Sequence, residues 1–255
     1  MVISMKNIMK LELKKICSKK DVMLMFGIII LIPLFMAVCI VNEVAGISFG
    51  GAVSVDGFGL LIWSFLKYLF VLYLVPIYVC CSFLGKEVET RSINIMLSNQ
   101  KRSTILAAKA IVYIAVLTLF FALFQGASVL TFQLLLNGTE YGAAMEASVM
   151  ETVFAYLFQW LELMFVLFLA MVLCSIIKGN AALLLGMIIV ILQRVLVNFD
   201  GIKKFVPYYI SDYSSYVLIP GEQLAGSNVM STMVYAVILV VLALGAMRIW
   251  RNRDF

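Results

Sequence analysis

The chain has 255 residues, of which 64% are hydrophobic and only 13% are charged, and its 19 Lys and Arg outnumber its 14 Asp and Glu. A soluble domain is about half apolar and about a quarter charged, so this composition predicts that lipid is the solvent for most of the chain. There is no histidine, which excludes the usual general base at neutral pH and any Ser-His or Cys-His catalytic pair.

The first predicted element is a basic amphipathic helix over residues 1–21. A row of lysines runs beside an apolar stripe with helical spacing, made of Val2, Met5, Met9, Leu13 and Ile16. Such a helix lies in the lipid headgroup layer, where its lysines meet anionic lipid. Glu12 falls within the stripe and interrupts it. A solvated basic tail is the alternative.

Six apolar runs are long enough to cross a membrane as helices, which takes about 20 residues each. These predicted spans are Val22–Val41, Phe58–Leu84, Ile105–Leu130, Met150–Ile177, Ala181–Phe199 and Val229–Ile249. No run has the alternating pattern of a membrane β-strand. The sequence therefore predicts an all-α membrane protein with one transmembrane domain over residues 1–255. Pro33 and Pro76 are expected to kink the first and second spans.

Lys and Arg are concentrated on one side of the predicted membrane. Six precede the first span, five lie in or beside the loop between the second and third spans, one lies between the fourth and fifth, and three lie at the C-terminal end. The loops Glu43–Gly57 and Asn137–Val149, on the other side, contain neither residue. The positive-inside rule therefore predicts that both termini are cytoplasmic. This distribution explains the positive charge without a nucleic-acid partner.

The segment Gly85–Thr104 forms the longest predicted cytoplasmic loop and reads GKEVETRSINIMLSNQKRST. Ile93, Met96 and Leu97 supply an apolar patch that charges of both signs surround. A connector between antiparallel helices needs only a few residues. A loop of this length with a helical, amphipathic middle favours docking on another protein, and a short helix lying on the bilayer is the alternative.

A charged residue deep inside a span costs about 2.5–3.5 kcal/mol on insertion scales, and Lys67, Glu162 and Arg194 are the candidates for such a cost. Lys67 and Glu162 are expected at similar depth, whereas Arg194 is near enough to the outer end of its span to snorkel. We expect Lys67 to pair with Glu162, or Glu162 to bridge Lys67 and Arg194. Contact of these charges with a cationic or amphipathic substrate is the alternative.

Residues 200–228, between the fifth and sixth spans, are rich in aromatic residues and contain two prolines. A pair of short extracytoplasmic helices, re-entrant or on the surface, fits this pattern. An aromatic belt at the membrane interface fits it equally. The five cysteines of the chain form no CxxC pair, and four lie in apolar runs, which is typical of small buried hydrophobic residues rather than of a metal or disulfide framework.

The middle of the chain contains an acidic pair, a short apolar helix, Leu-Ser, and an Arg seven residues before a Lys, here Glu87, Glu89, Ile93–Leu97, Ser98, Arg102 and Lys109. This pattern resembles the permease subunits of ABC-2 type transporters. The N-terminal LELKKICSKKD and the ending RIWRNRDF resemble the same family. The family often has a proline three residues before that Arg, where this chain has Asn99.

The resemblance implies a division of labour between subunits. ATP and Mg would bind a separate cytoplasmic ABC ATPase, this chain would hold no cofactor, and a second permease chain, identical or a sister, would complete the unit. Residues 85–104 would form a coupling helix on the ATPase, and the coupling residues implied are Glu87, Glu89, Arg91, Ile93, Met96, Leu97 and Arg102. The chain contains no GxxxxGK[ST] phosphate loop, which agrees with a nucleotide site elsewhere.

Among members of that family, the layout looks most like the permeases of bacterial antimicrobial-peptide immunity and bacitracin-type resistance systems. The likeness implies export of an amphipathic peptide, antibiotic or lipid-like compound across a bacterial plasma membrane. A non-transporting membrane scaffold or a channel-like protein is the alternative. An intramembrane protease is disfavoured, because the chain has no histidine and no Asp well inside a predicted span.

Overall fold

The computed structural model describes residues 5–42, 44, 52–90, 92, 101–143, 149–199, 201–212 and 225–252. These residues are mostly helical and contain no β-strand, only an isolated bridge between Val53 and Gly142. Six helices are long and apolar enough to cross a membrane. The chain is therefore an all-α, multi-pass membrane protein, as the sequence predicts.

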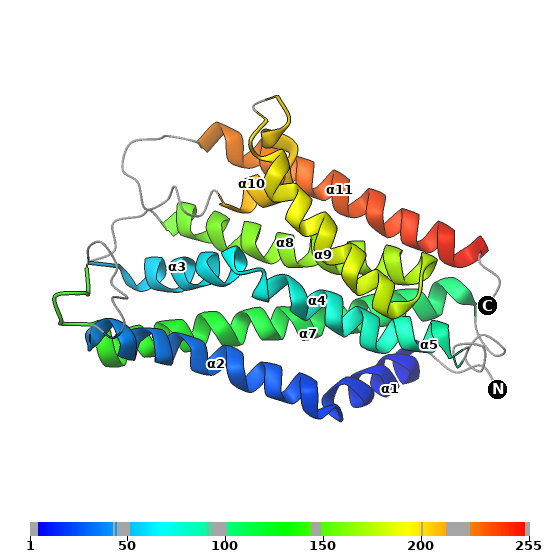
Figure 1. Ribbon diagram of the computed structural model, residues 1–255, viewed down its shortest axis with the longest axis horizontal. Coiled ribbons are helices and arrows are strands. Elements are labelled where there is room, and N and C mark those ends of the chain that lie inside the picture. The colour runs from blue at the N-terminus through cyan, green and yellow to red at the C-terminus, as the bar shows by residue number, and fades with distance from the viewer. Residues whose placement is uncertain are drawn as a thin grey trace.

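The helices run side by side along the long axis of the molecule (Figure 1). The helices in the predicted spans are α2 (Lys20–Val41), α3 (Val55–Tyr68), α4 (Val71–Cys80), α7 (Arg102–Thr131), α8 (Val149–Ile176), α9 (Gly179–Leu196) and α11 (Ala225–Asn252). The other elements are α1 (Met5–Cys17), the π-helical turn η2 (Cys81–Gly85), α5 (Lys86–Glu89), the π-helical turn η3 (Phe132–Leu136), the 3-10 turn η4 (Lys203–Phe205) and α10 (Pro207–Asp212).

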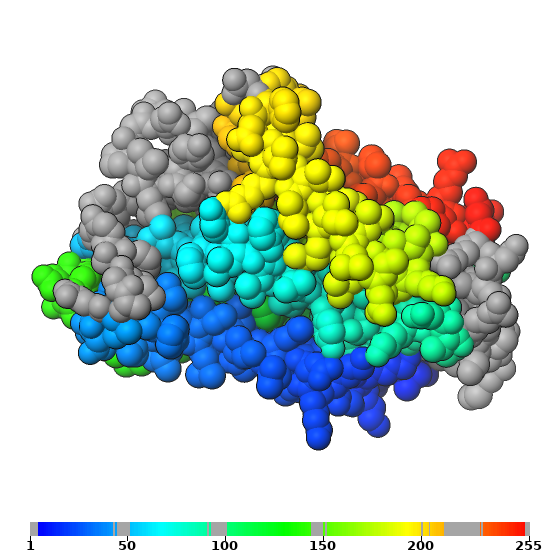
Figure 2. All heavy atoms as spheres, in the orientation of Figure 1, coloured from blue at the N-terminus to red at the C-terminus, as the bar shows by residue number. Residues whose placement is uncertain are grey.

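Helix α8 is the centre of the bundle. It packs against α4, α9, α10 and α11. In the most apolar stretch of α8, 72% of the residues are buried, compared with 11% in α11 and 28% in α2 and in α9. Most of α8 is hidden in Figure 2, where α2, α4 and α9 supply much of the visible surface. Exposed Leu, Ile, Val and Met side chains on the outer helices suit a lipid solvent, because lipid tails are as apolar as these residues.

One end of the bundle gathers α1, α5, the turn between α8 and α9, and the last turns of α11 (Figure 1). We call it the basic end, because Lys and Arg are concentrated in and beside these elements. The guanidinium of Arg102, at the start of α7, donates to the carbonyl of Arg251 near the end of α11 (3.1 Å). The start of α7 and the end of α11 therefore meet at this end, where α1 also lies (Figure 1).

The second span is broken in the middle, which the sequence does not predict. Between α3 and α4, Phe70 has a left-handed φ of 60°, a conformation that costs a non-glycine residue roughly 1–2 kcal/mol. The amide of Phe70 donates to the carbonyl of Lys67 (2.9 Å). The break does not lie at either proline, because Pro76 is inside α4 and Pro33 is inside α2.

Candidate functional site

Four charged side chains form a closed ring at the basic end, which we call the basic-end network. Lys109 Nζ lies 2.8 Å from Glu12 Oε2 and 2.7 Å from Glu87 Oε2. Lys15 Nζ lies 3.1 Å from Glu12 Oε1 and 2.7 Å from Glu87 Oε1. Each carboxylate therefore bridges both lysines, and the ring is neutral. It joins three elements, α1, α5 and α7.

The packing of α1 places this network inside the protein. Ile8, Glu12 and Ile16 are one helical turn apart, and all three are buried on the side of α1 that faces the bundle. Met5 and Leu13, from the stripe predicted to be apolar and lipid-facing, are exposed. Ile16, also from that stripe, is buried beside Glu12, so the predicted stripe is divided between two faces of α1 and Glu12 lies on the face toward the bundle. Val2 lies outside the described residues.

The residues of the basic-end network differ in how deeply they are buried. The side chains of Glu12 and Lys109 are fully buried, whereas that of Lys15 is 43% exposed. Partial burial favours a lower pKa for Lys15, but its hydrogen bond to Glu87 and the charges of Glu12 and Glu87 together raise that pKa above the usual value. A raised lysine pKa keeps the stabilising charge throughout the range below about pH 10 and loses it only above. Lys15 therefore keeps its positive charge, and its contacts with Glu12 and Glu87, at neutral pH.

The coupling residues implied by the resemblance have different positions. Glu87 belongs to the network, Glu89 is exposed at the end of α5, and Arg102 contacts Arg251. The remaining ones, Arg91, Ile93, Met96 and Leu97, lie outside the described residues. The sequence did not predict that Glu12, Lys15 and Lys109 join Glu87 in one ring of ion pairs. The available sign was a carboxylate at a helical position flanked one turn away on each side by isoleucine, which indicates a buried cationic partner.

A second ion pair lies in the middle of the bundle, formed by Lys67 and Glu162, and we call it the intramembrane pair. Lys67 Nζ is 3.2 Å from Glu162 Oε2, and the two residues are 2% and 4% exposed. The hydroxyl of Tyr73 donates to the other carboxylate oxygen of Glu162 (2.6 Å). The structure thus brings together the two residues that the sequence marks as costly in a span.

The ammonium of Lys67 also holds α10. It donates to the carbonyl of Tyr208 (3.1 Å) and to the hydroxyl of Ser211 (2.5 Å), and it lies 4.2 Å from the centre of the Tyr208 ring. These contacts supply Lys67 with hydrogen-bond acceptors in a region without bulk water, which a buried ammonium requires. The C-terminal end of α3 and the α10 segment are therefore fixed to each other.

Helices α9 and α11 hold α10 from two other directions. The amide of Tyr208 donates to Gln193 Oε1 on α9 (3.3 Å), and the hydroxyl of Tyr235 on α11 donates to the carbonyl of Pro207 (2.6 Å). Tyr208 and Ser211 are buried. In the described part of residues 200–228, the 3-10 turn η4 and the short helix α10 precede α11, and α10 packs against α8. Residues 213–224 lie outside the described part.

Arg194 does not join the intramembrane pair. Its guanidinium lies 3.7 Å from the centre of the Tyr68 ring, and Nη1 donates to the Tyr68 carbonyl (3.3 Å). This carbonyl is at the end of α3, where the helix break leaves carbonyl groups without an intrahelical partner. The expected bridge from Glu162 to Arg194 is therefore absent, and Arg194 instead supports the break in the second span.

The arrangement holds charged and polar side chains inside the helical bundle. Among the described residues, no three His, Cys, Asp or Glu side chains gather as metal ligands would. No family model and no curated protein matches this chain. Function therefore has to be argued from the network, the intramembrane pair and the topology.

Proposed function

We propose that this chain is the membrane-spanning permease subunit of an ATP-driven exporter of the ABC-2 type, with its basic end in the cytoplasm of a bacterial cell. One observation carries the proposal, namely that Glu87 is held by Lys109 of α7 and Lys15 of α1. A passive loop between two spans does not need a fully buried lysine at its base. A loop that receives force from another protein does need such an attachment.

The network provides a route from the loop to the spans. A partner that pushes on residues 90–101 would move α5, and the ion pairs of Glu87 would pass that movement to α7 and α1. Buried ion pairs suit this role, because separating them leaves a buried charge without its partner. Removing one partner of such a pair lowers the free energy of unfolding by about 3–5 kcal/mol. The partner in this proposal is a cytoplasmic ATPase that holds ATP and Mg and contacts Glu89, Arg91, Ile93, Met96, Leu97 and Arg102.

The working unit in this proposal contains two permease chains, identical or sister, and two ATPases. ATP-driven closure of the ATPases would rock the spans between inward-open and outward-open states and expel an amphipathic peptide, antibiotic or lipid-like compound. The intramembrane pair and its contacts with the buried α10 support this idea, because polar groups inside a membrane protein commonly mark substrate or ion pathways.

Co-purification tests the proposal. The protein, expressed with its neighbouring genes, should purify with a stoichiometric ATPase subunit. Replacing Ile93 and Leu97 with Glu should remove that subunit, because a docked apolar patch cannot accept two carboxylates without a large desolvation cost. Asn94→Glu with Gln100→Glu adds the same charge outside the patch and should keep the subunit. A solitary, stable chain without nucleotide-dependent behaviour would instead indicate a scaffold or a channel-like protein.

A further inference from the structure

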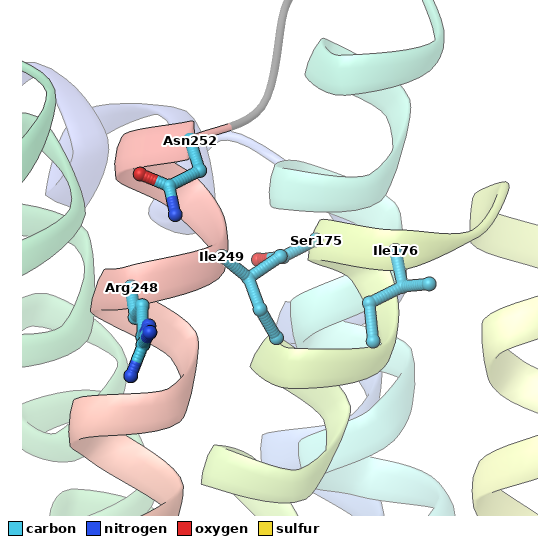
Figure 3. Close-up of a pocket in the computed structure, with 5 residues that line it drawn as sticks. All are labelled: Ser175, Ile176, Arg248, Ile249 and Asn252. Carbon is cyan, nitrogen blue, oxygen red and sulfur yellow. The ribbon is translucent and has the colours of Figure 1, made fainter.

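A hollow of about 460 Å³ lies at the basic end between the last turns of α8 and α11. It is open to one side and is lined by Ser175, Ile176, Arg248, Ile249 and Asn252 (Figure 3). Ser175 and Ile176 come from the last turn of α8, and the other three residues come from the end of α11. Neither the basic-end network nor the intramembrane pair includes any of these residues.

The orientation of α11 at this point is set by Trp250, which is fully buried. Residues two positions before and after a helical residue point about 160° away from it, given 3.6 residues per turn. Arg248 and Asn252 therefore both point away from the core, and both are exposed. Figure 3 shows them along α11, with Ile249 between the two helices beside Ser175 and Ile176.

The lining combines a cation with apolar surface. Arg248 makes no hydrogen bond or ion pair with any described residue, so its guanidinium is available to an anion. Ile176 is 53% exposed beside it. A guanidinium binds phosphate oxygens with two parallel N–H groups, the Asn252 amide adds further donors, and the isoleucines suit a hydrocarbon chain.

We propose that this hollow binds one anionic phospholipid from the leaflet at the basic end. The phosphate contacts Arg248 and Asn252, and an acyl chain lies along Ile176 and Ile249. The site would fix lipid at the junction between the central helix α8 and α11, the span with the least buried surface in the described structure. The inference does not depend on an ATPase partner.

The observations favour a lipid over a free phosphate ion. One exposed arginine holds a dissolved anion weakly, because water and salt screen the charge. A lipid is already confined to the surface at which Arg248 lies, and each basic residue near an anionic surface strengthens binding about fivefold. The acyl chain adds apolar contact that a phosphate ion lacks.

Native mass spectrometry of the full-length protein in detergent tests the site, with phosphatidylglycerol and phosphatidylcholine as the probes. The wild type should bind the first about fivefold more tightly than the second. Arg248→Gln should remove this preference. Arg251→Gln removes the same charge from the same helix at a position outside the hollow, and it should change the preference less than about twofold.

Each other outcome overturns the proposal. If Arg248→Gln and Arg251→Gln reduce the preference for phosphatidylglycerol equally, the preference comes from diffuse surface charge. If the wild type does not prefer phosphatidylglycerol over phosphatidylcholine, the hollow is not a site for an anionic lipid. Binding of inorganic phosphate that depends on Arg248 and displaces phosphatidylglycerol would show a site for a soluble anion. Thermal unfolding in phosphatidylcholine should be the same for all variants. If Arg248→Gln is unstable, Asn252→Leu replaces it, and an unchanged preference in that variant also overturns the proposal.

Discussion

Glu12 and Glu162 are buried carboxylates, and each is held by a lysine from another helix, Lys109 of α7 and Lys67 of α3. A buried carboxylate without a partner would cost several kcal/mol in a medium of low polarity. The lysines therefore do more than attract the carboxylates, because they determine which helices meet at these two points. Removing one member leaves the other as an uncompensated charge.

The intramembrane pair allows a double-substitution test. Glu162→Gln should lower the free energy of unfolding by about 3–5 kcal/mol, because it leaves the ammonium of Lys67 buried without its counter-charge. Combining it with Lys67→Met should cost less than the single change, since the stranded charge is gone. Thermal unfolding in lipid nanodiscs measures both. Additive losses would show that the two side chains do not stabilise each other.

The basic-end network contains its own matched control. Lys109→Met and Lys15→Met remove the same charge from the same two carboxylates, but the side chain of Lys109 is fully buried and that of Lys15 is 43% exposed. Lys109→Met should cost about 3–5 kcal/mol, and Lys15→Met should cost about 1 kcal/mol or less, because water replaces the lost partner. Equal losses in a thermal unfolding experiment would argue against a buried ring.

At the scale of elements, the second span departs most from what its sequence predicts. No glycine or proline marks positions 68–70, where the helix breaks. The contacts at the break involve residues far away in the sequence. Arg194 donates a hydrogen bond to the Tyr68 carbonyl, and Lys67 pairs with Glu162 and donates to the Tyr208 carbonyl. Local sequence patterns carry no information about such contacts. A sequence alone could therefore predict the span but not its division.

The half of the second span that is nearer the basic end approaches the turn before α9 very closely. A Cβ added to Gly85 would lie 3.0 Å from the Cα of Gly179 and 3.4 Å from Cys174 Sγ, and Cys81 Sγ is itself 3.4 Å from Cys174 Sγ. Backbone atoms cannot yield as the end of a flexible side chain can. The two glycines thus let η2 pack directly against the start of α9.

Replacing these glycines tests that packing. Gly85→Ala should lower the free energy of unfolding by about 1–3 kcal/mol through overpacking. Gly27→Ala, in α2, places its methyl group in open space and should be neutral or stabilising by up to about 1 kcal/mol, because alanine is the better helix former. Thermal unfolding of the two variants gives the comparison. A Gly85→Ala protein as stable as the Gly27→Ala protein would show that the helices separate easily here.

At the scale of the whole molecule, hydropathy predicts what depends on local composition. The number and order of the spans and the common end of α1 and α11 agree with the sequence, although the second candidate span is Val71–Glu89 instead of Phe58–Leu84. A run of about 20 apolar residues is most stable in lipid as a helix. The pairing of Lys67 with Glu162 could be hypothesised from cost and depth alone. The ring of Glu12, Lys15, Glu87 and Lys109 and the position of α10 could not, because they depend on which helices pack together.

The native cysteines provide a test of the orientation of the whole bundle. Cys17, at the basic end, is exposed, whereas Cys39, Cys80, Cys81 and Cys174 are buried. If the basic end faces the cytoplasm, a membrane-impermeant maleimide should label the wild type once per chain in inverted membrane vesicles and leave intact cells unlabelled. A Cys17→Ser protein carrying Glu140→Cys, exposed at the opposite end, should show the reverse pattern. Labelling of Cys17 from outside intact cells would place the basic end outside and would contradict the docking of a cytoplasmic ATPase on residues 85–104.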